Sequence, residues 1–403
     1  MKPDIKIEQY TYSLPEEKIA KYPLPDRDAS KILIFENNLI SEAKFLILPQ
    51  LLASDSLIVF NNTKVVPARL LFRKPTGATI EIFCLEPYKP ADYISSFSSI
   101  GECYWTAVVG NAKRWRSGTL YFGFDGDESL IKLNLRATLE RKLDSSFLIK
   151  FQWDEEVTFS EVLEICGKVP IPPYLQRETQ DIDKERYQTL YAKERGSVAA
   201  PTAGLHFTEK VINGIRMRGV EISEISLHIG AGTFVPVKSE AIIDHKMHSE
   251  AFSVSLDFIK KILNKYLDKK SIVAVGTTSA RCIESLYYLG VQCIEDGEPK
   301  SVSQWEPYLL KSEVSVIQTL EALIKWMVDN GQNSLNRKTE IIIVPGYGFK
   351  LVNTLITNFH QPQSTLLLLI AAFIGQSWRE VYNYALQNNF RFLSYGDSSI
   401  LFR

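Results

Sequence analysis

The sequence predicts an α/β fold: a discontinuous α/β domain with a largely parallel sheet, interrupted by an inserted small antiparallel β-barrel domain. Two observations predict it. Residues 64–155 form short segments of alternating polarity, whereas residues 1–63 and 156–403 repeat the order strand, loop, helix. Apolar runs without alternation, joined by helices, are typical of a largely parallel sheet covered on both faces. We therefore expect residues 1–63 and 156–403 to form one catalytic domain.

The inserted domain of residues 64–155 is expected to contain six strands. Phe147, Ile149, Phe151 and Trp153 alternate with Leu148, Lys150 and Gln152, which is the period of a half-buried strand, and Leu133, Leu135, Ala137 and Leu139 alternate similarly. Further candidates span residues 65–71, 78–85, 104–110 and 118–124, with turn signals between them. Short strands at this spacing indicate a small barrel.

In the larger domain, apolar strands end in polar clusters. The expected strands cover residues 56–60, 222–229, 271–275, 341–344 and 355–357. A helix should follow Gly276-Thr277-Thr278-Ser279, and another should begin at Ser364 as N-cap and run to Gly375. In such sheets, ligands bind beyond the carboxyl ends of the strands, so the polar clusters mark the expected site.

The bulk composition excludes several classes of protein. The five cysteines form no C-x-x-C pair, the N-terminus lacks the apolar core of a signal peptide, and the longest apolar run, residues 366–374, has nine residues. A membrane span needs about 20. We expect a soluble, cytoplasmic protein with no membrane partner. A net charge of −1 speaks against nucleic acid, but residues 64–155 carry 13 basic and 11 acidic side chains, so a local RNA-binding patch remains compatible with the total.

The five histidines all fall outside the predicted barrel, in contexts rich in Gly, Thr, Ser or acidic residues, which favours a shared pocket over five unrelated core histidines. The candidates for proton transfer are His206, His228, His245, His248 and His360, with Asp244, Glu250 and Asp397 as alternatives. Which of them is the general base stays open. A metal site at Asp244, His245, His248 and Glu250 is disfavoured because the stretch lacks a helical period and a familiar metal spacing, so no metal is expected.

Two further motifs leave alternatives open. Gly230-Ala-Gly232 follows a predicted strand, as in nucleotide-binding turns, but Thr233-Phe-Val-Pro236 makes the required helix improbable. On the barrel, a basic loop surrounds Trp115, which suits RNA but equally suits a solvated loop. Its candidate RNA-binding residues are Arg73, Lys74, Lys113, Arg114 and Arg116.

Blocks along the whole chain resemble one family, the S-adenosylmethionine:tRNA ribosyltransferase-isomerases. They include Phe60-Asn-Asn-Thr-Lys-Val-Val-Pro-Ala-Arg-Leu70, Pro170-Ile-Pro-Pro-Tyr174, Tyr187-Gln-Thr-Leu-Tyr191, Ala199-Ala-Pro-Thr-Ala-Gly-Leu-His-Phe207, Leu227–Phe234, Asp244–Glu250, Gly276-Thr-Thr-Ser, Pro345-Gly-Tyr347, Thr357-Asn-Phe-His360 and Arg391-Phe-x-Ser-Tyr-Gly-Asp397. The order of the blocks makes the resemblance specific. Residues 291–340 look like a family-variable helical insertion, with an amphipathic helix around Val316, Leu320, Leu323 and Met327, and Asn353 and Gln361 depart from the pattern.

The resemblance implies transfer and isomerisation of the ribosyl part of S-adenosylmethionine onto 7-aminomethyl-7-deazaguanine (preQ1) at the wobble position of GUN-anticodon tRNA. Adenine and methionine would leave, S-adenosylmethionine would be a co-substrate, no other cofactor would be needed, and the protein would act as a monomer. Arg281 could pair with the methionine carboxylate. The implied substrate-binding residues are Asn61, Asn62, Arg69, Thr202, Gly204, Gly230, Gly232, Thr233, Gly276, Thr277, Thr278, Arg281, Tyr347, Asn358, Ser364 and Tyr395. The alternatives are an RNA-binding paralogue with altered or lost activity and an S-adenosylmethionine-dependent methyltransferase.

Overall fold

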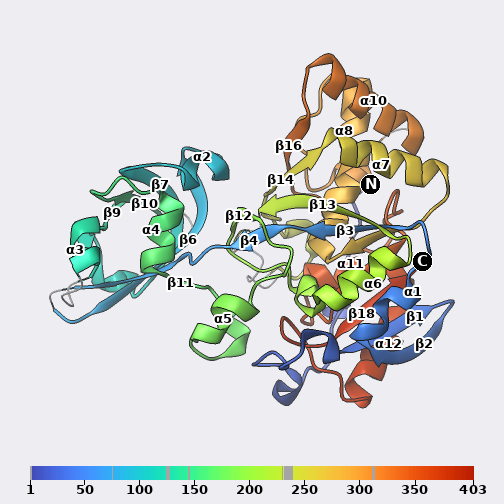
Figure 1. The fold of residues 1–403 in the computed structure, drawn as a ribbon, viewed down its shortest axis with the longest axis horizontal. Coiled ribbons are helices and arrows are strands. Elements are labelled where there is room, and N and C mark those ends of the chain that lie inside the picture. Colours follow the sequence, from blue (N-terminus) through green and yellow to red (C-terminus); the bar gives the residue numbers. More distant parts are fainter. Residues whose placement is uncertain are drawn as a thin grey trace.

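The computed structural model describes residues 2–74, 76–123, 128–143, 146–228, 230, 239–310 and 314–403. Two sheets lie in separate parts of the molecule, with β4 (Thr63–Val65) and β12 (Glu194–Ser197), paired with each other, between them (Figure 1). No helix within the described ranges is long and apolar enough to cross a membrane.

The larger sheet has nine strands in the order β16-β14-β13-β3-β15-β17-β18-β1-β2. Their bounds are β1 Lys31–Glu36, β2 Leu39–Lys44, β3 Leu57–Asn61, β13 Glu221–His228, β14 Glu250–Ser255, β15 Ile272–Val275, β16 Ser334–Thr339, β17 Thr354–Asn358 and β18 Ser398–Phe402. β13, β3, β15 and β17 form a parallel block, and β18 is parallel to β1.

The prediction of a largely parallel sheet is therefore only partly right. β2, β14 and β16 pair with their neighbours in antiparallel fashion, and so does β17 with β18. Apolar runs report burial on both faces and carry no information on strand direction, which is why the pattern missed this. The β1–β2 hairpin turns through Asn37 and Asn38, both with positive φ, as a tight two-residue turn requires.

Helices cover both faces of this sheet, as predicted. One face packs on α7 (Leu256–Leu267), α8 (Thr277–Glu295), α10 (Val316–Asp329), α11 (Thr365–Ile374) and α12 (Trp378–Gln387). The other packs on α1 (Leu48–Leu51) and α6 (Glu209–Met217). Alternate residues of a strand face opposite sides, so Leu57 and Val59 of β3 join the first core and Ile58 and Phe60 join the second.

The smaller sheet is antiparallel, with the order β11-β5-β6-β7-β10-β9-β8. Its strands are β5 Arg69–Arg73, β6 Thr79–Lys89, β7 Glu102–Gly110, β8 Thr119–Tyr121, β9 Arg136–Lys142, β10 Phe147–Gln152 and β11 Gly167–Lys168. Six of the seven fall within residues 64–155, the number predicted. β8 and β11 stand at opposite ends of the described sheet and do not pair with each other, so the sheet is a curled half-barrel, which is compatible with the predicted small antiparallel barrel.

Elements beyond residue 155 belong to this smaller core. Phe159, Val162 and Leu163 of α4 (Phe159–Cys166) pack against the curled sheet, and β11 extends it. The helix begins at Thr158, whose side chain accepts from the Glu161 amide while the Glu161 carboxylate accepts from the Thr158 amide. We therefore propose that the inserted unit runs from about residue 64 to Lys168 instead of ending at 155.

Short helices fill the connections. They are α2 Tyr93–Phe97, α3 Glu128–Leu133, α5 Asp181–Arg186, α9 Glu306–Leu309 and the 3₁₀ turns η1 Ile7–Gln9, η2 Glu16–Lys18, η3 Arg27–Ala29, η4 Phe45–Ile47, η5 Ala112–Arg114, η6 Pro173–Leu175, η7 Thr202–His206, η9 Ile242–Asp244 and η10 Gly375–Ser377. Leu133 ends α3, so the predicted strand through Leu133 and Leu135 begins only at Arg136.

Local signals located two helices closely. Ser364 caps α11 by accepting from the Leu367 amide, and α10 buries Val316, Leu320, Leu323 and Met327, as the amphipathic pattern predicts. The segment 291–340 also supplies the edge strand β16, so it is more than a helical addition.

Residues 341–344 are buried but form no strand. Tyr308 donates to the Ile342 carbonyl and accepts from the Val344 amide, and Arg281 donates to the Ile341 carbonyl. The buried backbone groups of this segment therefore form hydrogen bonds with side chains instead of with a neighbouring strand.

Candidate active site

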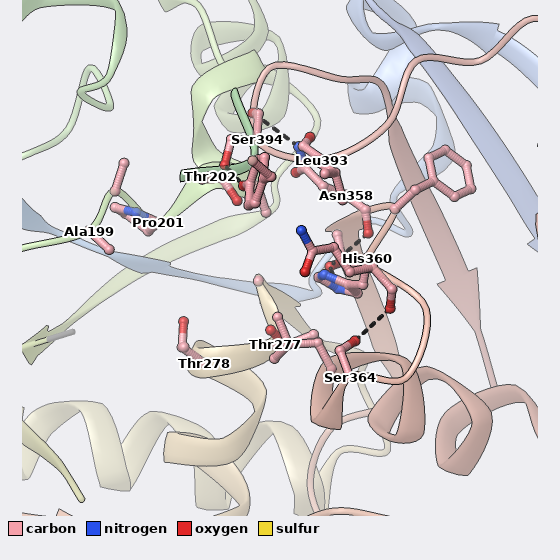
Figure 2. A pocket seen from close by; sticks show the side chains of 18 of the residues that line it. Ala199, Pro201, Thr202, Thr277, Thr278, Asn358, His360, Ser364, Leu393 and Ser394 are labelled. Carbon is pink, nitrogen blue, oxygen red and sulfur yellow. Dashed lines mark hydrogen bonds between the residues drawn. The ribbon is translucent and has the colours of Figure 1, made fainter. Parts of the chain in front are cut away.

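A cavity lies where β15 and β17 end side by side. Val275 of β15 pairs with Ile356 of β17, and the amide of Gly276 donates to the Ile356 carbonyl over 2.8 Å. The chain therefore leaves the sheet at neighbouring points, and the loops that follow enclose the cavity (Figure 2). Its walls comprise Tyr174, Tyr187, Ala199, Ala200, Pro201, Thr202, Ala203, Gly276, Thr277, Thr278, Thr357, Asn358, Phe359, His360, Gln361, Ser364, Thr365, Leu366, Leu393 and Ser394.

Two helices begin at this cavity. α11 is capped by Ser364, whose hydroxyl also donates to the Gln361 carbonyl over 2.7 Å. α8 starts after Gly276, at φ +93°, and no side chain caps it. The first amides of a helix carry partial positive charge and need acceptors. The first turn of α8 therefore presents amides without a side-chain acceptor beside the cavity, a feature that suits an anionic group.

His360 is the one histidine of the five that lines this cavity. Its Nε2 lies 3.0 Å from the Thr357 hydroxyl oxygen, and its backbone amide donates a hydrogen bond to the Tyr382 hydroxyl. Burial lowers the pKa of His360 to about 3, so the imidazole is neutral at physiological pH. A neutral imidazole held at one nitrogen has the other available for proton transfer.

Two buried polar atoms at the cavity lack a hydrogen-bond partner in the described structure: the Tyr187 hydroxyl and Oδ1 of Asn358. Burial raises the pKa of Tyr187, so it remains a donor. The Asn358 amide nitrogen donates to the Leu393 carbonyl over 2.9 Å, which fixes the side chain (Figure 2). Unsatisfied buried groups of this kind suit contacts with a polar ligand.

His206 lies in a smaller neighbouring pocket that shares Ser394 with the cavity. Its Nδ1 is 2.8 Å from the Ser30 hydroxyl oxygen, and burial lowers its pKa to about 4. Asp397 accepts from the amides of Lys31 and Arg391, and the Tyr395 hydroxyl donates to Asp183 over 2.7 Å. Asp397 and Tyr395 are therefore hydrogen-bonded within the fold, whereas Nε2 of His206 has no hydrogen-bond partner in the described structure.

The other three histidines lie elsewhere, so the expectation of one shared pocket is corrected. His228 lines a groove between the two sheets and stacks on Tyr93. His248 Nε2 lies 3.6 Å from Oε1 of Glu250, and the pKa of His245 is lowered by burial. Asp244 ends η9, two residues after the buried Ile242.

Several predicted binding residues are committed to the fold. Arg281 pairs with Glu250 over 2.8 Å, the Tyr347 hydroxyl donates to Glu284 over 2.7 Å, and Arg69 forms a two-fold hydrogen bond with Glu81. We therefore do not assign these three to a ligand.

Asn61 and Asn62 fasten β3 to β13. Oδ1 of Asn61 accepts from the amides of Thr63 and Leu227, and Asn62 contacts Glu224 and Ser226. A Cβ on Gly204 would lie 1.9 Å from the Tyr191 hydroxyl, so this glycine allows a close approach. A Cβ on Gly230 would lie 3.8 Å from Oε1 of Glu86, and Gly232 and Thr233 lie outside the described residues.

The basic loop keeps its predicted exposure. Lys113, Arg114 and Arg116 are exposed, whereas Trp115 is buried and donates to the Gly118 carbonyl, so the Trp anchors the loop. Lys74 donates a hydrogen bond to the Arg114 carbonyl, and Arg73 is the last residue of β5. Arg73 and Lys74 therefore lie at the same end of the curled sheet as the basic loop.

The binding residues predicted from the sequence did not include Tyr174, Tyr187 and Gln361, which line the cavity. Tyr174 and Tyr187 occur in the blocks quoted for the family resemblance, so a signal was present. Neither residue follows a strand of the sheet. Because the sequence analysis looked for the site at the carboxyl ends of strands, it did not select them. Asn353 instead accepts from Ser271 and from the Ile272 amide at the start of β15.

Fold and site together define an α/β protein with a cavity at the carboxyl ends of parallel strands, joined to a curled antiparallel sheet. The family model described as queuosine biosynthesis protein matches residues 7–401, and the chain belongs to this family. Relatives named S-adenosylmethionine:tRNA ribosyltransferase-isomerase include one from Halothermothrix orenii, 36% identical over 98% of this chain and 100% of its own, and one from Clostridioides difficile, 37% identical with the same coverage. A crystal structure of S-adenosylmethionine tRNA ribosyltransferase from Thermotoga maritima is 26% identical, covers 98% of this chain and 99% of its own, and gives a TM-score of 0.47.

Proposed function

We propose that this protein transfers and isomerises the ribosyl moiety of S-adenosylmethionine onto 7-aminomethyl-7-deazaguanine in tRNA, releasing adenine and methionine. The relatives' name supports the reaction class, and full-length coverage of those relatives supports the same activity for the whole chain. The observation that carries the site assignment is the cavity itself. It joins an uncapped helix N-terminus to a neutral histidine.

S-adenosylmethionine has an anionic carboxylate, a sulfonium cation and an uncharged adenosine. The carboxylate suits the start of α8, where Thr277 and Thr278 present amides and hydroxyls. The sulfonium suits the aromatic walls of Tyr174 and Tyr187, since cations are attracted to ring faces. Hydroxyls and amides such as Thr202 and Asn358 suit the ribose and adenine.

His360 is our choice for the general base. When its Nε2–H donates to the Thr357 hydroxyl, that hydroxyl can donate on to the Asn358 carbonyl at 3.4 Å, and Nδ1 is left unprotonated. A sulfonium acidifies the neighbouring C5′ protons, and the unprotonated Nδ1 of His360 is the proposed acceptor for one of them. The departing adenine needs a donor, for which the unpartnered Tyr187 hydroxyl is placed in the same cavity.

The proposed second substrate is tRNA that carries the modified base at a GUN anticodon. We propose that the protein acts as a cytoplasmic monomer, with no membrane partner and with no metal or further cofactor. The exposed loop with Lys113, Arg114 and Arg116, together with Arg73 and Lys74, is the proposed contact for the RNA backbone.

One assay tests the function and its alternatives. The protein is incubated with labelled S-adenosylmethionine and tRNA bearing the aminomethyl-deazaguanine, and both the small products and the base are identified. We expect adenine, methionine and epoxyqueuosine. S-adenosylhomocysteine as product would mean a methyltransferase, and tRNA binding without adenine release would mean an RNA-binding paralogue.

A further inference from the structure

A second cavity, the interdomain groove, lies between the curled sheet and the edge of the nine-stranded sheet. We define it by Glu86, Tyr93, His228, Ser253, Asn336 and Lys338. Its volume is about 550 Å³, within the roughly 300–1,000 Å³ typical of small-molecule sites. No step of the proposed S-adenosylmethionine chemistry uses it.

The floor of the groove is a flat polar sheet face. Ala251 pairs with Lys338 and Ser253 with Asn336, while the intervening Phe252 and Val254 point into the core. Antiparallel strands with one buried face leave the other open to solvent or a ligand. Ala251 and Ser253 are small, so the β14 side of this floor leaves room for a planar group.

One wall is a stacked pair of rings. The Tyr93 and His228 rings lie 4.7 Å apart between centroids, with an interplanar angle of 6°. Nδ1 of His228 is fixed by donating to the Gly196 carbonyl over 2.9 Å. Gly196 has φ +145°, and a Cβ there would lie 2.3 Å from that nitrogen, so the backbone makes room for the pair. Rigid aromatic surfaces of this kind bind nucleobases by stacking.

The groove is also lined by a carboxylate, that of Glu86 on β6. Glu86 has no side-chain hydrogen bond or ion pair among the described residues, whereas Asp92 already accepts from the Ser95 amide. An ionised carboxylate only accepts hydrogen bonds. Of the nucleobases, a guanine-type ring presents two adjacent N–H donors on one edge, so it matches Glu86 best. Lys338 supplies the positive charge that a phosphate requires.

The groove is close to the S-adenosylmethionine cavity along the chain. Gly196 holds His228, and Ala199 lines the cavity three residues later. Three residues span at most roughly 10 Å. A base in the groove and a ligand in the cavity therefore approach each other across the segment 196–201.

We propose that the interdomain groove binds the deazaguanine ring of the tRNA substrate, stacked on the Tyr93–His228 pair with Glu86 accepting hydrogen bonds from its guanine edge. This inference rests on the proposed function. It extends the proposed function by naming where the second substrate binds and which side chains recognise it.

The test measures the Kd of wild type and variants for two tRNAs that differ only at the wobble position, guanine or 7-aminomethyl-7-deazaguanine. We expect Glu86→Gln to raise Kd for both by roughly 10- to 100-fold, because one hydrogen bond loses its charge and the other is replaced by an unfavourable contact between two donors. Glu140→Gln, an exposed carboxylate on β9 outside the groove, is the matched control and should leave both values unchanged.

Weakening confined to the aminomethyl tRNA would overturn the edge assignment, because Glu86 would then read the ammonium group. No weakening of either would overturn the groove as base site. Tyr93→Leu should weaken binding and Tyr93→Phe should not, which separates stacking from the hydroxyl. The Kd for S-adenosylmethionine should stay constant in all variants. Failure of wild type to release adenine would count against the proposed function alone, because these binding values do not depend on turnover.

Discussion

Arg281 on α8 donates from Nη1 to Oε2 of Glu250 on β14 over 2.8 Å, and both side chains are buried. Burial alone would raise the pKa of Glu250, but the nearby Arg281 and His248 more than compensate and hold it below its usual value. Arg281 therefore joins α8 to the sheet edge through Nη1, while its Nη2 has no hydrogen-bond partner in the described structure. Our proposal places the methionine carboxylate at the helix end with Thr277 and Thr278.

Removing one partner of this pair should be strongly destabilising. Arg281→Met leaves the Glu250 carboxylate buried without its cation, and we expect the free energy of unfolding to fall by about 3–5 kcal/mol. The double variant with Glu250→Gln should recover part of that loss. Urea unfolding monitored by fluorescence measures both. Lys325→Met, which breaks the exposed pair with Asp329, is the control and should change stability by less than about 1 kcal/mol.

His360→Asn should lower kcat for adenine release by roughly 100-fold or more, as loss of a general base does, while the Kd for S-adenosylmethionine changes little. Thr357→Val should lower kcat less, because the base is retained without its hydrogen-bond partner. Thr357→Ser should restore it. Single-turnover measurements give the chemical step directly, and an unchanged His360→Asn rate would assign the proton transfer to another group.

Stability should fall as the pH drops below about 6.5. The pKa values of His206 and His360 in the folded protein are about 4 and about 3, below the unfolded value of 6.5. The unfolded chain then takes up protons that the native state excludes, so stability is complete above the unfolded pKa and declines toward the folded ones. Each histidine contributes a slope of about 1.4 kcal/mol per pH unit.

Chemical unfolding at several values between about pH 5 and pH 6 tests this contribution. The variant His206→Gln should reduce the slope by the share of one histidine, whatever its effect on stability at neutral pH. An identical slope in wild type and variant would show that His206 does not stay neutral in the folded protein.

Thr278→Asp should separate a binding role of the α8 terminus from a structural one. An acidic side chain in the first turn favours a helix, so thermal stability should hold or rise slightly. The same charge repels a carboxylate, and we expect the Kd for S-adenosylmethionine to rise by roughly 10-fold. Calorimetric titration measures it. Gln318→Asp, in the first turn of α10, places the same charge away from the cavity and should leave this Kd unchanged.

The double variant Lys113→Ala with Arg114→Ala should weaken binding of any tRNA and lower the slope of log Kd against log salt by about 1–2, since each side chain neutralises about one phosphate. Filter binding over a salt series measures the slope. Lys210→Ala with Lys260→Ala, two exposed lysines on α6 and α7, is the matched control. Equal slopes in wild type and the Lys113 and Arg114 variant would remove this loop from the RNA interface.

The sequence by itself determined the features that depend on neighbours along the chain. A cap such as Ser364 and the spacing of Val316, Leu320 and Leu323 located their helices, because a helix is built from contacts three and four residues apart. The polar residues after β15 and β17 marked the cavity, because parallel strands end at one edge of a sheet. The ordered blocks indicated the family that the whole-chain match confirms.

Only the tertiary structure decided which polar side chains are free to meet a ligand. Arg281 and Glu250 are 31 residues apart and Tyr347 and Glu284 are 63 apart, so their pairing has no local signature. His360 stands at the cavity and His228 at the groove for the same reason: each position follows from strands that pair across long separations. Burial and hydrogen-bond partners are properties of packing, and packing brings together residues that the sequence keeps apart.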